Sequence, residues 1–124
     1  LIIYDNYFFG QMKYNDDFGN WYSNIFLKQY PRPPRNDSPI TNTESMRYGF
    51  DLVKDERYTN EVEFSLDEFV DYLITLTNIT TVLEKNPNKL SEIKNWLRGE
   101  LAKYFQNSRK ILIFGGYIWY FFSI

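Results

Sequence analysis

Leu1-Ile2-Ile3-Tyr4-Asp5 opens the chain as an apolar run that ends in an acid. A short apolar run rich in β-branched and aromatic residues is typical of a buried strand. We therefore expect residues 1–8 to form one strand, ended by Gly10. Open α/β sheets bind ligands beyond the carboxyl ends of their strands. The residues that leave this strand are therefore candidates for a substrate site, and they are Asp5, Asn6 and Tyr7.

The other end of the chain supplies a second apolar run, from Ile111 to Ile124, which contains no charged residue. It is shorter than the roughly 20 residues that a membrane-spanning helix needs, and Gly115-Gly116 interrupts it. We predict a terminal strand over residues 110–122, with either a glycine bulge or a hairpin turn at the glycine pair.

Between these runs the spacing of apolar residues predicts helices. Residues 17–30 place Phe18, Trp21, Tyr22, Ile25 and Phe26 on one helical face, and Asp16 or Asp17 is the expected N-cap. Trp21 and Tyr22 are candidates for the inner wall of a substrate lid, although core packing of an amphipathic helix explains them more simply. Ser65-Leu66-Asp67-Glu68 has the pattern of a capping box, and Pro87 suits the first turn of a further helix, so we expect two helices over residues 65–105.

The sequence pattern is less regular in the middle of the chain. Residues 31–39 hold four prolines, which exclude a helix or a central strand and predict a loop. A short helix is expected over residues 43–48, ended by Gly49, and a strand region over residues 49–64 with a turn or bulge within 55–60. Arg47 is a candidate for binding an acidic substrate through paired N–H donors.

Composition limits the classes of function. The 124 residues suffice for one domain, and the net charge of -2 argues against nucleic acid as a partner. Without Cys or His, the chain offers no thiolate or imidazole for a metal or for catalysis. The absence of Cys fits a reducing compartment, so we expect a cytoplasmic protein. Because Leu1 lies inside an apolar run, we also expect the chain to be part of a longer protein.

The order of these segments resembles the C-terminal part of a class I S-adenosylmethionine-dependent methyltransferase of the bacterial, small-molecule type. The resemblance implies an α/β fold that contributes the fifth to seventh strands of the sheet and looks α+β when isolated. In it, residues 1–8 are the fifth strand and residues 9–48 a helical lid insertion. Gly49-Phe50-Asp51-Leu52-Val53 leads into the sixth strand, the helix from Ser65 to Leu73 follows, and an antiparallel strand closes the chain.

The sequence departs from this family in one respect. The glycine-rich loop and the acid that hold S-adenosylmethionine are missing from these residues. The resemblance therefore implies that the cofactor binds to another part of the parent protein and not tightly to this chain, which would be inactive alone. It implies a small-molecule substrate bound by Asp5, Asn6, Tyr7, Trp21, Tyr22 and Arg47, with no membrane or metal involved.

Two other interpretations remain open. The aromatic share of 20% also suits a small-molecule binding module without catalysis, because flat amphipathic side chains line such pockets. Alternatively, an exposed strand edge lets two copies of the chain pair as a homodimer.

Overall fold

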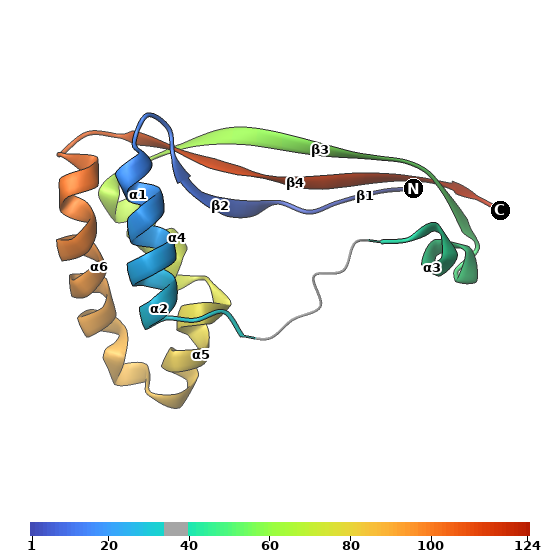
Figure 1. The fold of residues 1–124 in the computed structure, drawn as a ribbon. Helices are drawn as coiled ribbons and strands as arrows, with labels where there is room; N and C mark the ends of the chain where they lie inside the picture. The colour runs from blue at the N-terminus through green and yellow to red at the C-terminus, as the bar shows by residue number, and fades with distance from the viewer. Residues whose placement is uncertain (34–39) are drawn as a thin grey trace. The chain divides into compact units, whose positions relative to one another are not determined.

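The computed structural model describes residues 1–33 and 40–124. Two strands open the chain, groups of helices precede and follow the third strand, and the strands form an open antiparallel sheet (Figure 1), which confirms a mixed α and β architecture. In chain order the elements are β1 (Ile2–Tyr4), β2 (Tyr7–Met12), α1 (Asp16–Trp21), the π-helix η1 (Tyr22–Phe26), α2 (Leu27–Gln29), α3 (Asn42–Arg47), β3 (Phe50–Phe64), α4 (Leu66–Ile74), α5 (Thr77–Lys85), the 3-10 helix η2 (Pro87–Lys89), α6 (Leu90–Phe105) and β4 (Lys110–Ser123).

The chain divides into two compact units. Unit 1 holds Leu1–Phe9, the described residues of Arg35–Glu61, and Ile113–Ile124. Unit 2 holds the described residues of Gly10–Pro34 together with Val62–Leu112. The boundaries fall within β2, β3 and β4, so each unit contains part of these three strands.

In unit 1 the first and last apolar runs of the sequence pair with each other. β1 is antiparallel to β4, and β4 runs between β1 and β3 (Figure 1). The register is Ile2↔Tyr120, Ile3↔Trp119 and Tyr4↔Ile118. The terminal strand is thus confirmed. The alternative of a hairpin at Gly115-Gly116 is wrong, because β4 continues through both glycines and neighbouring strands hold it on both edges.

The prediction of one buried strand over residues 1–8 is wrong. The strand is interrupted at Asp5-Asn6, and β1 is exposed along its whole length, with Ile2 at 62%. The second strand also does not end at Gly10 but continues to Met12. This position requires glycine, because the backbone φ is +75° and because a side chain there would collide with the ring of Tyr22.

The core of unit 2 is largely aromatic. Phe18 is fully buried, and rings from α1, η1, α4 and α6 surround it. Their centroids lie between 5.7 and 6.5 Å from that of Phe18, and they belong to Trp21, Tyr22, Phe69 and Tyr104. Burial of each such side chain contributes roughly 1.5–3 kcal/mol, so this cluster holds the helices of unit 2 together.

The helix expected over residues 17–30 forms, with two differences. Its N-cap is Asn15, whose side chain accepts the N–H of Phe18 at 3.2 Å. Its second half passes through the π-helix η1, in which the backbone N–H of Leu27 bonds to the carbonyl of Tyr22. This wider turn buries Phe26 and leaves Ile25 exposed. Contrary to the prediction, Ile25 therefore does not belong to the buried face of the helix.

The capping box at the start of α4 is confirmed. The N–H of Glu68 donates to the Ser65 hydroxyl at 3.2 Å, and the N–H of Ser65 donates to the Glu68 carboxylate at 2.8 Å. Arg109 adds a salt bridge to the same carboxylate at 2.7 Å. The hydrogen bonds with Ser65 lower the pKa of Glu68 most, and the bond and charge of Arg109 lower it further.

We expect Glu68→Gln to lose a stabilising effect that depends on pH. Glutamine keeps an acceptor for Ser65 but has no charge for Arg109. Because folding lowers the pKa of Glu68, its contribution is complete above the ordinary value of 4.5 and disappears as pH falls through the lowered value. Urea denaturation across pH should therefore show a stability gap between wild type and variant at neutral pH that closes in acid. A gap of constant size would contradict this assignment.

Three other stretches can be compared with the prediction. Residues 65–105 hold three α-helices and not two, because Leu76 adopts an extended conformation that ends α4 and starts α5. β3 runs without a turn from Phe50 to Phe64, since it pairs with the long strand β4. The short helix expected over residues 43–48 is α3, followed by Gly49 at a φ of +83° as predicted. Most of the expected proline-rich loop, residues 34–39, lies outside the described residues.

Candidate functional site

Asp5 marks the point at which β1 ends against β4. Its N–H donates to the carbonyl of Tyr117 at 3.1 Å, as in an ordinary antiparallel pair. The N–H of Tyr117, however, donates to the Asp5 carboxylate oxygen Oδ1 at 2.6 Å and not to the Asp5 carbonyl. The carboxylate thereby replaces a backbone acceptor and is held in a fixed position at the end of the strand. Gly116 makes this contact possible, because a side chain there would collide with Asp5.

Tyr58, from β3, completes the cluster. Its hydroxyl donates to the free carbonyl of Asp5 at 2.5 Å and lies 3.2 Å from Oδ1 of Asn6. Burial raises the pKa of Tyr58, and the negative charge of Asp5 raises it further. The hydroxyl therefore stays protonated at neutral pH and acts as a donor. We name Asp5, Asn6 and Tyr58 the Asp5 cluster.

A cation and aromatic rings border the Asp5 cluster within unit 1. The Arg57 guanidinium lies 5.4 Å from the ring centroid of Phe9 and 6.0 Å from that of Tyr117. Tyr7, the third residue predicted here, is exposed, and its ring lies 5.1 Å from that of Phe9. The Asp5 cluster itself offers a carboxylate, an amide and a hydroxyl, which are polar groups that can orient an organic molecule.

We expect Tyr58→Phe to loosen the end of β1 without unfolding the protein. The substitution removes the hydroxyl that bonds to Asp5 and Asn6, at a cost of about 0.5–1.5 kcal/mol. The amide of Tyr117 should then exchange with solvent faster, because Asp5 is its acceptor. Hydrogen exchange followed by NMR measures this, with Tyr120→Phe as control, since the Tyr120 hydroxyl bonds to Glu56 instead. Equal exchange in both variants would contradict the role given to Tyr58.

The structure brings together only some of the predicted site residues. Asp5, Asn6 and Tyr7 lie in unit 1, where Asp5 and Asn6 contact Tyr58 and Tyr7 contacts Phe9. Trp21 and Tyr22 lie in unit 2, where they are 1% and 6% exposed, so core packing accounts for most of their surface. Arg47 is exposed in the last turn of α3.

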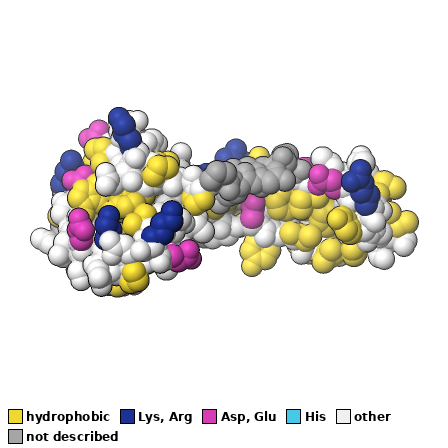
Figure 2. Space-filling view, turned by 90° about the horizontal axis from the view of Figure 1, so that it is seen from below, with side chains coloured by type: hydrophobic (Ala, Val, Ile, Leu, Met, Phe, Trp, Pro, Cys, Tyr) yellow, Lys and Arg dark blue, Asp and Glu magenta, His cyan; other side chains and the backbone are white. Residues whose placement is uncertain are grey.

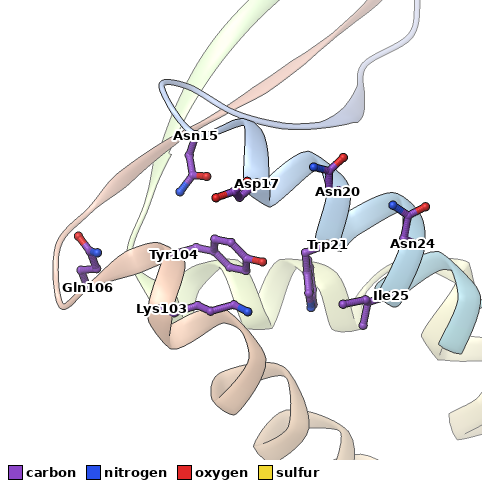
Figure 3. Close-up of a pocket in the computed structure, with 9 residues that line it drawn as sticks. All are labelled: Asn15, Asp17, Asn20, Trp21, Asn24, Ile25, Lys103, Tyr104 and Gln106. Carbon is purple, nitrogen blue, oxygen red and sulfur yellow. The ribbon is translucent and has the colours of Figure 1, made fainter.

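A pocket of about 550 Å³ opens on unit 2 (Figure 3). One wall comes from the helix that runs through α1 and η1, and the other comes from the C-terminal end of α6. Polar side chains predominate around it, and the edges of two buried aromatic residues form its floor. Its lining residues are Asn15, Asp17, Asn20, Trp21, Asn24, Ile25, Lys103, Tyr104 and Gln106.

Unit 1 carries an apolar surface of a different kind. Figure 2 shows hydrophobic side chains gathered on this unit, and a groove of about 320 Å³ lies among them. The groove is lined by Leu1, Ile3, Ile40, Glu44, Ser45, Tyr48, Phe50 and Phe121. Exposed apolar clusters of this type mark surfaces that contact other molecules.

Sequence reasoning missed Tyr58 and the pocket of unit 2. Tyr58 reaches Asp5 only through the pairing of β3 with β4, which joins residues 53 positions apart. A signal for the pocket existed in Asp17, Asn20 and Asn24, which repeat at three and four residues on the predicted helix. In the part of the chain that the structure describes, no group of His, Cys, Asp or Glu is arranged to hold a metal ion. No helix there has the length and apolarity to cross a membrane.

Comparison of the chain with protein-family models, with curated proteins and with solved structures finds no match.

Proposed function

We propose that these residues form the substrate-side, C-terminal portion of a class I S-adenosylmethionine-dependent methyltransferase that acts on a small molecule. The observation that carries the proposal is the pairing of strands in unit 1. The opening strand β1 is antiparallel to the closing strand β4, which also pairs with β3. These are the three segments that the family plan assigns to the fifth, the closing and the sixth strands.

In this proposal the Asp5 cluster contacts the methyl acceptor. The bond from Tyr117 fixes the Asp5 carboxylate, which keeps further lone pairs for a hydroxyl or amine of the substrate. Tyr58 fixes the backbone beside it. S-adenosylmethionine, bound by another part of the protein, supplies the methyl group. The contribution of this chain is to orient the acceptor, and orientation supplies much of the rate in such transfers.

The exposed apolar residues of β1 also support the proposal. Each of the three β1 residues is exposed although two are isoleucines. A strand of this composition is normally covered on its faces and paired on both edges. The cofactor-binding part of the proposed parent protein would provide that cover.

The coding sequence upstream of Leu1 tests the proposal. We expect it to encode a strand, a glycine-rich turn of the GxGxG type and a helix, because this unit binds the cofactor through backbone N–H groups. An upstream reading frame that lacks such a unit would contradict the proposal.

The apolar groove of unit 1 favours a second candidate, which is self-association. Two copies could pair through the exposed edge of β1, as isologous dimers commonly do. Sedimentation equilibrium of the chain and of Ile3→Lys, which places a charge in the groove, tests self-association. A dimer that the lysine abolishes supports self-association, whereas a monomer at all concentrations excludes it.

A further inference from the structure

The pocket of unit 2 contains a polar group that packing of the protein does not explain. Tyr104 is nine-tenths buried, and its hydroxyl points into the pocket (Figure 3). That hydroxyl has no hydrogen-bond partner among the described residues. The ring itself is fixed, since it packs edge-on against Phe18 at 5.7 Å and lies under the Lys103 ammonium at 5.1 Å. A rigid ring that directs a free hydroxyl into a cavity is prepared to bond to a ligand.

Trp21 makes the floor of the pocket equally rigid. Its ring lies 6.3 Å from Tyr104 and 5.7 Å from Phe26, and its indole N–H donates to Glu100 at 3.2 Å. The donor of Trp21 is therefore already used within the protein. Only the carbon edge of the indole is left for a ligand, and Ile25 adds a second apolar contact at the rim.

The walls of the pocket are rich in side-chain amides. Asn20 and Asn24 lie one turn apart on the helix through α1 and η1, roughly 6 Å along the axis. Asn15 contributes its amide nitrogen, because its oxygen already accepts the N–H of Phe18, and Gln106 lies on the opposite wall. An amide both donates and accepts hydrogen bonds, as does the Tyr104 hydroxyl.

The charges of the pocket cancel. Asp17 stands on the α1 wall and Lys103 on the α6 wall (Figure 3), and they are the only charged residues that line it. The pocket therefore gives no net attraction to an anion or a cation. Groups that donate and accept at once match the hydroxyls of a neutral polyol, while Trp21 and Ile25 suit its C–H surface. The volume lies within the range of small-ligand sites.

We propose that this pocket binds a neutral, polyhydroxylated ligand of the size of a single sugar ring. The proposal does not depend on methyl transfer, because every lining residue belongs to unit 2 and none belongs to the Asp5 cluster.

The test is a titration of the whole ¹⁵N-labelled chain followed by NMR. The probes are methyl α-glucoside and myo-inositol as neutral polyols, with glucuronate and glucosamine as charged molecules of similar size. We expect the neutral probes to shift the indole N–H of Trp21 and the side-chain amides of Asn20 and Asn24, with millimolar affinity. Tyr104→Phe should raise the dissociation constant about two- to tenfold, as the loss of one neutral hydrogen bond implies.

Two variants control this titration. Tyr48→Phe removes an exposed hydroxyl from unit 1 and should leave the affinity unchanged. Asn20→Ala alters the rim without touching the buried floor, so it should weaken binding without affecting the fold, which circular dichroism checks. Absence of shifts with both neutral probes would overturn the proposal. So would an unchanged dissociation constant in both Tyr104→Phe and Asn20→Ala, or tighter binding of either charged probe.

Discussion

Replacing Phe18 with alanine is expected to destabilise the protein by about 3–5 kcal/mol, the usual cost of truncating a buried phenylalanine. Phe18 is 0% exposed and lies among aromatic rings of α1, η1, α4 and α6. The cavity would remove contacts from all of these elements at once. Chemical denaturation followed by tryptophan fluorescence reports the loss, because Trp21 adjoins the cavity.

Tyr14→Ala is the matched control for Phe18→Ala. Tyr14 is an aromatic residue four positions earlier, but it is 93% exposed. Its truncation should change stability by no more than about 0.5 kcal/mol, as is usual at the surface. If the two variants lost similar amounts of stability, Phe18 would not be the centre of the core of unit 2.

Gly116→Ala is expected to have the second largest effect, and it acts on the Asp5 cluster. A methyl group at residue 116 would occupy the position of Asp5 Oδ1 and lie 2.7 Å from the Asp5 carbonyl oxygen. The end of β1 must then move away from β4, which breaks the bond from Tyr117 to Asp5. Overpacking of this kind costs roughly 1–3 kcal/mol. Denaturation measures the cost, and hydrogen exchange at Tyr117 locates it.

Gly99→Ala separates this clash from a general effect of losing glycine. Gly99 lies within α6, and a methyl group there would meet no atom within 4 Å. Alanine should stabilise that helix by up to about 1 kcal/mol. The two variants are thus expected to change stability in opposite directions. A neutral or stabilising Gly116→Ala would contradict the position that we assign to Asp5.

Local signals in the sequence predicted much of the helical structure. The capping box at Ser65 and Glu68 involves atoms three residues apart, so the sequence alone determines it. The same holds for α3 and its terminal glycine. Ile25 shows where local reasoning fails. A regular helix would place it on the apolar face, but the π-helix rotates it outward while Phe26 is buried.

The sheet and the site depend on contacts that a linear pattern does not contain. An apolar run at residues 1–4 suggested burial, yet whether a strand is covered depends on what lies beside it, and β1 is exposed in this chain. Asp5 and Asn6 were predicted from their position after a strand. Tyr58 was not predicted, because its alternating surroundings in β3 resemble those of any half-exposed strand. The pocket of unit 2 was not predicted, because asparagine residues on a helix are ordinarily exposed to solvent.

Isothermal titration of S-adenosylmethionine into the natural protein that contains these residues tests the proposed function most directly, with the 124-residue chain measured in parallel. We predict that the natural protein binds the methyl donor and that these 124 residues alone do not, because they contain no glycine-rich turn of the GxGxG type. Failure of the natural protein to bind the donor would contradict the account.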